Sequence, residues 1–257
     1  MASNLDPTEP TKSLRELNAK RTTGAAMATK IIVSYDGTAN ENDAIALGRV
    51  FERAGAEVAL AYVRHTHEPD RNRETLVQSE AHELLERGAA IFGSSEIARH
   101  VVTDRSTPEG LRALAERERA DVIVFCSDSH TAHGHITIGN SAERLLEGGT
   151  TAIAIAPVGL AEQPVAEIQQ IVAVSDGDGG ARETARTLAS ALGAAVAPVA
   201  DGGTHLLVVD SRADAAAGHI WLSASARHVV EIARYPVLML PRGVALTFSG
   251  VAAAVSA

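Results

Sequence analysis

A stretch of small and hydroxylated residues offers the groups that bind phosphate. It begins at residues 126–129 (Cys-Ser-Asp-Ser) and ends nine residues later at 139–142 (Gly-Asn-Ser-Ala), where a helix is predicted to begin. A turn of small residues leading into a helix presents free backbone N–H groups and the positive end of the helix dipole, which both favour an anion. The hydroxyl of Thr137 would add a donor. The alternative is capping of the helix by Asn140 or Ser141, which needs no ligand.

Asp36 is the second residue with a chemical role to consider. It follows the apolar run 31–34 and precedes Gly37 and Thr38. A carboxylate at the end of a strand can accept a hydrogen bond from an adenine amino group or a ribose hydroxyl. The alternative is an Asx turn that ends the strand, a common use of Asp before Gly.

Five histidines form a third group: His65, His67, His130, His133 and His135. The predicted sheet places all of them at one edge, where imidazoles could bind a transition metal or change charge near pH 6.5. No carboxylate or cysteine completes a known ligand spacing, and loop histidines are usually solvated. We therefore expect no metal site, and we leave a phosphate contact by His130 or His135 open.

Alternating strands and helices must position these groups. Apolar, β-branched runs predict strands at 31–34, 58–63, 98–102, 121–125 and 151–156, with a helix between each pair. Right-handed crossovers then give an α/β fold with a doubly wound, open, parallel five-stranded sheet of order 3-2-1-4-5. Ligands bind such sheets at the carboxyl ends of the strands where the winding reverses, between the first and fourth strands. Asp36 and residues 126–129 are predicted to meet there.

The chain repeats itself in a shortened form. Residues 134–142 align with 218–226 without a gap, and residues 31–37 are echoed by 171–177. Such internal similarity indicates duplication of one α/β unit. The second unit lacks a counterpart of the first unit's long helix and third strand.

The second repeat is expected to be structural. It keeps Asp176, but Ser223 and Ala224 replace the Gly-Asn pair of the first repeat. We also expect the segment after Val209 to be shorter than its counterpart, and Trp221 to crowd the loop.

The pattern divides the chain into five parts. They are a disordered tail at 1–29, a first domain at 30–158, a linker at 159–168, the truncated repeat at 169–242 and a second tail at 243–257. The natural start is Met1 or Met27. The short repeat has too little surface to bury a core alone, so we expect it to pack on the first as an intramolecular pseudo-dimer. A homodimer is left open.

Composition excludes several classes of protein. The 257 residues are 46% hydrophobic, enough for a buried core, and their net charge of −9 argues against a nucleic-acid partner. No apolar run approaches the ~20 residues of a membrane span. The single cysteine, Cys126, cannot form an internal disulfide, which fits the cytoplasm, and at a strand end it is most often a small buried hydrophobe.

Residues 30–157 resemble a universal stress protein, and the whole chain resembles the tandem members of that family. The family signature is a strand ending in Asp, then Gly-x-x-Gly, nine residues and Gly-Ser/Thr, an Ala-Glu-Arg-like helix start and a strand ending near proline. Residues 31–36, 139–146 and 152–157 match parts of it. The sequence departs from the signature at Cys126 and Ser129, which stand where glycines belong, and at Asn140 in place of Ser/Thr.

The resemblance implies an adenine nucleotide site in the first repeat. Adenine would lie against Ser34, Tyr35, Asp36 and the backbone at Val63; the phosphates would be wrapped by the loop carrying Cys126, Ser129, Gly139, Asn140, Ser141 and Ala142. Glycines matter where a backbone must approach a ligand closely, so their loss would weaken binding.

We therefore expect an ATP-binding sensor or regulator of the stress response that is not an enzyme. No nucleophile–base pair is recognisable, and the Gly-Lys-Ser/Thr end of a P-loop is absent. One alternative is an interaction or scaffold protein of the same fold that binds no nucleotide. The other is a slow ATPase.

Overall fold

The computed structural model describes residues 28–38, 40–65, 70–163, 168–175, 179–200 and 205–250. The first repeat alternates strands and helices as predicted, and a short 3-10 helix follows it. Its elements are β1 (Lys30–Ser34), α2 (Glu41–Arg53), β2 (Glu57–Arg64), α3 (Arg71–Phe92), β3 (Ala98–Thr103), α4 (Thr107–Glu118), β4 (Val122–Cys126), α5 (Asn140–Leu146), β5 (Ala152–Ala156) and η1 (Leu160–Glu162).

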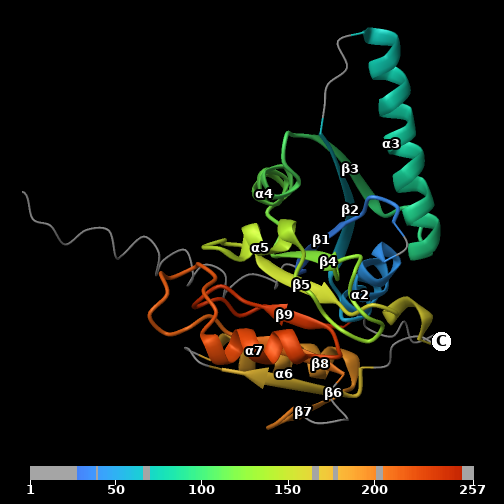
Figure 1. The fold of residues 1–257 in the computed structure, drawn as a ribbon. Coiled ribbons are helices and arrows are strands. Elements are labelled where there is room, and N and C mark those ends of the chain that lie inside the picture. Colours follow the sequence, from blue (N-terminus) through green and yellow to red (C-terminus); the bar gives the residue numbers. More distant parts are fainter. Residues whose placement is uncertain are drawn as a thin grey trace, which may run out of the picture.

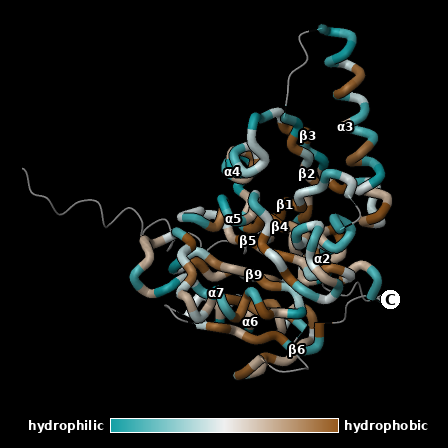
Figure 2. Tube along the Cα trace, in the orientation of Figure 1, coloured by the Kyte–Doolittle hydropathy of each residue, from teal (hydrophilic) through white to brown (hydrophobic). Residues whose placement is uncertain are grey.

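The five strands form a parallel sheet in the order β3-β2-β1-β4-β5, which confirms the predicted order. The central strands read as apolar runs, VIVFC in β4 and AIAIA in β5, because helices cover both faces of the sheet. Figure 2 shows this apolar layer along the strands and on the helix sides that face them.

Helices α2 and α3 pack on one face of the sheet, and α4 and α5 pack on the other (Figure 1). Gly88 brings α3 close to β1 and β2, since a Cβ at this position would lie 2.9 Å from the Tyr35 ring and 3.0 Å from Leu60. The buried residues of α3 begin at Ala81, whereas Leu76 is 60% exposed. The first turns of α3 therefore project beyond the sheet (Figure 1).

The second repeat reproduces part of the first. Its elements are β6 (Gln170–Val174), α6 (Gly180–Leu192), β7 (Ala195–Ala197), β8 (Leu206–Val209), α7 (Ala224–Ile232) and β9 (Val237–Met239). The order β7-β6-β8-β9 corresponds to β2-β1-β4-β5. Within the described residues α3, β3 and α4 have no counterpart, so the deletion lies between β7 and β8.

The expectation of a shorter segment after Val209 was wrong. The offset between the repeats stays at 84 positions from the pair Val122–Leu206 to the pair Pro157–Pro241. The same hydrogen bond forms in each repeat. The Gly134 N–H donates to the Val158 carbonyl, and the equivalent Gly218 N–H donates to the Arg242 carbonyl, both at 2.8 Å. The loop is therefore retained in length and in hydrogen bonding.

The two repeats meet edge to edge, where β5 and β9 pair antiparallel and join all nine strands into one sheet. Ala154 pairs with Leu238, its equivalent in the second repeat, so the register is symmetric about this pair. Beside the strands Glu143 and Arg227, also equivalent positions, form an ion pair at 2.8 Å. At this contact the two repeats are thus related by an approximate two-fold axis.

Residues 243–250, the described part of the segment that we set apart as a tail, pack across both repeats. Leu246 is buried, and its N–H donates to the hydroxyl of Thr184 on α6 at 2.9 Å. Phe248 is 5% exposed and stacks on Phe51 of α2, with ring centroids 5.9 Å apart. This segment therefore covers α2 and α6 together.

Several expectations fall on residues outside the described ranges. These are the tail before residue 28, including Met27, and the segments 164–167 and 251–257 together with His67 and Asp176. No helix in the described part of the chain has the length and apolar character needed to cross a membrane.

Candidate functional site

A cavity of about 300 Å³ opens at the carboxyl ends of the central strands, where the winding of the sheet reverses. Ser34 at the end of β1 and the next two residues, Tyr35 and Asp36, line one part of it. The ends of β2 and β4 and the starts of α2, α4 and α5 line the rest. The lining residues are Ser34, Tyr35, Asp36, Glu41, Tyr62, Val63, His65, Thr107, Phe125 and Ser141. The volume lies at the lower end of the range of small-molecule sites.

Apolar and aromatic side chains form part of the walls: Tyr35, Tyr62, Val63 and Phe125. Val63 and Phe125 are 6% and 8% exposed, and Tyr35 is 4% exposed with its ring against Gly88. Burial, and next the neighbouring carboxyl of Glu41, raise the pKa of the Tyr35 hydroxyl, which is therefore a neutral donor at ordinary pH. Such walls suit a flat, apolar ring system more than a highly charged group.

Two carboxyl groups meet at the mouth of this cavity. Asp36 is exposed, and its Oδ1 accepts from the Thr38 N–H at 2.9 Å. The predicted Asx turn is therefore present in addition to the predicted place in the crevice, since Asp36 also lines the cavity.

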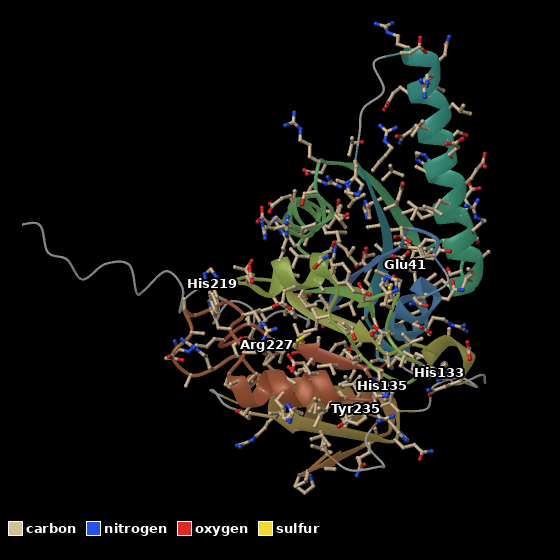
Figure 3. All side chains as sticks on the ribbon, viewed as in Figure 1. Glu41, His133, His135, His219, Arg227 and Tyr235 are labelled. Carbon is tan, nitrogen blue, oxygen red and sulfur yellow. The ribbon has the colours of Figure 1, made fainter. Side chains whose placement is uncertain are left out.

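Glu41 begins α2 and turns back into the cavity, where Figure 3 labels it. Its Oε2 accepts from the N–H groups of Asp36 and Gly37. Burial, and next the charge of Asp36, raise the pKa of Glu41 to about 9. At neutral pH Glu41 therefore holds a proton that it can donate.

The structure brings together about half of the predicted site residues. Ser34, Tyr35, Asp36, Val63 and Ser141 line the main cavity, and Asn140 lines a smaller hollow beside it. Four predicted residues line neither space: Cys126, Ser129, Gly139 and Ala142. Ala142 is a residue of α5 whose side chain is buried in the hydrophobic core.

Cys126 lies at the end of β4, mostly buried, as expected of a small hydrophobe. Burial is the chief reason why its pKa is raised to about 12. The thiol therefore stays protonated and is a poor nucleophile at neutral pH.

The loop between β4 and α5 folds onto β5 instead of over the cavity. Ser127 Oγ donates to the Ala156 carbonyl at 2.8 Å and accepts from the Thr137 N–H at 3.4 Å. His133 lies against Gly159, so closely that a Cβ there would meet the ring at 2.1 Å. These contacts hold the loop against the start of η1.

The alternative of side-chain capping at α5 was wrong. The N-cap is Gly139, and no side chain caps the helix. Apart from its chain neighbours, no protein atom lies within 4 Å of a Cβ built on Gly139, so a side chain at this position would meet open space.

The histidines do not form one group. His65 lines the cavity and lies 3.3 Å from the Thr107 hydroxyl, whereas His133 lies 3.4 Å from the Glu162 carboxylate on η1. Figure 3 shows His133 and His135 well away from Glu41. Among the described residues no group of three or more histidine, cysteine or acidic side chains could hold a metal ion.

Sequence reasoning missed several lining residues: Glu41, Tyr62, Thr107 and Phe125, while His65 was considered only with the histidines. Phe125 and Tyr62 had a usable signal, because each lies near the carboxyl end of a predicted strand. Thr107 precedes the Pro108 that starts α4, which also places it at the edge of the sheet. Glu41 resembles any acidic residue of a first helical turn.

The second repeat places a buried carboxylate just after β8. Asp210 stands where the first repeat has Cys126, and it is 2% exposed. Its Oδ1 accepts from the Ala181 N–H at 2.5 Å, and its Oδ2 from the Ser175 hydroxyl at 2.9 Å. Asp210 thereby binds the start of α6 to the end of β8.

Trp221 does not crowd the loop as expected. It is 48% exposed, and its ring lies beside Gly148 of the first repeat. Its N–H backbone group donates to Ser211 Oγ at 3.1 Å, as that of Thr137 does to Ser127 in the first repeat.

Comparison with known proteins agrees with this architecture. The family model described as "Universal stress protein family" matches residues 27–157, and no curated protein matches the chain. A universal stress protein from Archaeoglobus fulgidus DSM 4304 has a TM-score of 0.63 at 14% identity, over 84% of this chain and 100% of its own. A putative universal stress protein from Pseudomonas aeruginosa UCBPP-PA14 has a TM-score of 0.55 at 15% identity, over 83% of this chain and 93% of its own.

At these identities the solved structures show a shared fold alone, and the fold extends over most of both repeats. The family model adds a match of the sequence itself over the whole first repeat, from β1 to the end of β5. The chain therefore belongs to the universal stress protein family.

Proposed function

We propose that the first repeat binds an adenine nucleotide, ATP, and that the protein acts as a regulator of the stress response and not as an enzyme. The observation that carries this proposal is the cavity beside β1. The aromatic and apolar part of its walls suits a base, and Asp36 in its lining supplies an acceptor. Family membership supports the same assignment. The absence of a catalytic set among the cavity residues is the reason for proposing regulation instead of turnover.

The roles of the two carboxyl groups follow from their protonation. Asp36 would accept a hydrogen bond from an amino group or a ribose hydroxyl, because its Oδ1 is only partly used by Thr38. Protonated Glu41 would offer a donor to a ring nitrogen and would avoid a second negative charge beside a nucleotide.

We also propose that the second repeat binds no nucleotide and that the repeats act as an intramolecular pseudo-dimer. Asp210 supports the first statement, because its hydrogen bonds already occupy the Ala181 N–H at the start of α6 and the Ser175 hydroxyl after β6, two donors that a ligand there would need. The symmetric pairing of Ala154 with Leu238 supports the second.

An interaction protein of the same fold that binds no nucleotide is the second candidate. The loop after β4 favours it, since that loop is hydrogen-bonded to β5 and lines no part of the cavity. The two candidates differ in whether ATP binds at all.

The test is calorimetric titration of the full chain with ATP, together with mass spectrometry of any nucleotide retained through purification. Asp36→Ala should weaken ATP binding about ten-fold, the usual effect of losing one charge-assisted hydrogen bond. Asp128→Ala is a matched control, because its Oδ1 accepts from the His130 N–H in a similar turn outside the cavity. No binding by the wild type at millimolar ATP would favour the interaction protein.

A further inference from the structure

A second, more open hollow of about 220 Å³ adjoins the main cavity. It lies between the first turns of α4 and α5, and it shares Thr107 and Ser141 with the main cavity. Its lining residues are Arg105, Ser106, Thr107, Pro108, Asn140, Ser141 and Arg144. The two spaces are therefore neighbours that meet at these two hydroxyl side chains.

The two spaces differ in charge. The carboxyl groups of Asp36 and Glu41 line the main cavity, which has no arginine or lysine, whereas Arg105 and Arg144 line the hollow, which has no carboxylate. Within the described part of the chain, neither guanidinium group makes a hydrogen bond or an ion pair.

The acidic residues close to these arginines in sequence have other partners. Asp104 Oδ1 accepts from the Ser106 N–H at 3.0 Å, Glu109 pairs with Arg112 at 2.6 Å, and Glu143 pairs with Arg227 of the second repeat at 2.8 Å. Among the described residues no carboxylate pairs with Arg105 or Arg144, so the hollow is suited to an anion.

We propose that Arg105 and Arg144 bind the phosphate groups of a nucleotide whose base occupies the main cavity. Guanidinium groups bind phosphate oxygens through paired, charge-assisted hydrogen bonds, and the hydroxyls of Thr107 and Ser141 supply further donors at the junction. Phosphate recognition then depends on Arg105, just before α4, and on Arg144 of α5, and not on the backbone of the loop after β4. This explains how the site works without the glycines at positions 126 and 129.

The inference rests on the proposed function, and one experiment separates the two. Adenosine, AMP and ATP are titrated calorimetrically into the full-length wild type, into the double variant Arg105→Gln/Arg144→Gln, and into Arg112→Gln. The last removes an arginine of α4 that lies outside both spaces. Both replaced arginines are exposed, so melting temperatures should stay the same in all three proteins.

The expected result is that the wild type binds ATP and AMP more tightly than adenosine. The double variant should lose about ten-fold or more in affinity for ATP while adenosine binding is unchanged, and Arg112→Gln should behave as the wild type. Equal ATP affinity in the wild type and the double variant would overturn the role of the arginines and leave nucleotide binding intact. If the wild type bound none of the three ligands, the proposed function would fall, and this inference with it.

Discussion

Replacing Glu41 by glutamine should stabilise this protein at neutral pH. In the wild type the buried carboxyl is held beside Asp36, and burial is the chief reason why its pKa is raised to about 9. Glutamine has nearly the same shape, and its carbonyl oxygen can accept from the same N–H groups of Asp36 and Gly37. The glutamine amide cannot ionise, so the free-energy cost of burying an ionisable carboxyl at this position disappears.

The size of the effect follows from the two pKa values of Glu41. In the unfolded chain the carboxyl titrates near pH 4.3, as an ordinary glutamate does. Between that value and about 9 the folded state keeps a proton that the unfolded state has released, so stability falls as the pH rises. The slope is about 1.4 kcal/mol per pH unit. From pH 5 to pH 8 the wild type should therefore lose about 4 kcal/mol relative to Glu41→Gln.

The assay is urea unfolding of both proteins at pH 5, 7 and 8. We expect similar stability at pH 5 and a gap that widens steadily above it, with a melting temperature roughly 10 °C higher for the variant at pH 8. Glu52→Gln is the control, since Glu52 is exposed on the same helix, and its curve should follow the wild type. Parallel pH profiles for the wild type and Glu41→Gln would show that Glu41 is ionised in the folded state, and the reasoning would fail.

Two further predictions concern contacts between the repeats. Phe248→Ala should lower the free energy of unfolding by about 3–5 kcal/mol, because it removes a buried ring stacked on Phe51. Val199→Ala, at a 69% exposed site, is the control and should change it by less than about 0.5 kcal/mol. Urea unfolding of both variants measures the two changes. Glu143→Arg should destabilise the contact with Arg227 by up to about 1 kcal/mol, and adding Arg227→Glu should restore the loss; a double-mutant cycle showing no coupling would contradict the pairing.

Strand composition and the internal repeat were enough to predict the order of the first five strands. The apolar runs of the buried strands are bounded by clear breaks, so their positions shift by only a residue or two. The start of α3 was less certain, because this helix is largely polar. It begins at Arg71, because the Asp70 carboxylate accepts from the N–H groups of Asn72 and Arg73. A single capping aspartate before a polar stretch is easily overlooked.

The candidate site was predictable where strands end and where the fourth predicted helix begins. Strand position predicts Asp36, the helix start predicts Ser141, and the family resemblance implies Val63. Glu41 enters the cavity because the chain after β1 turns back on itself, which local sequence does not reveal. Arg105 precedes α4 and Arg144 lies on α5, so tertiary packing alone brings them to one hollow.

The segment that ends with Phe248 also has a consequence for how the chain folds during synthesis. Proteins made on the ribosome usually fold their N-terminal parts first. Here the hydroxyl of Thr29 donates to the carbonyl of Thr247, 218 positions later, at 2.7 Å. The surface of α2 around Phe51 therefore stays uncovered by this segment until residue 248 has been synthesised. Contacts of such long sequence separation slow folding. A chain whose synthesis stops before residue 247 would therefore be a substrate for chaperones and proteases.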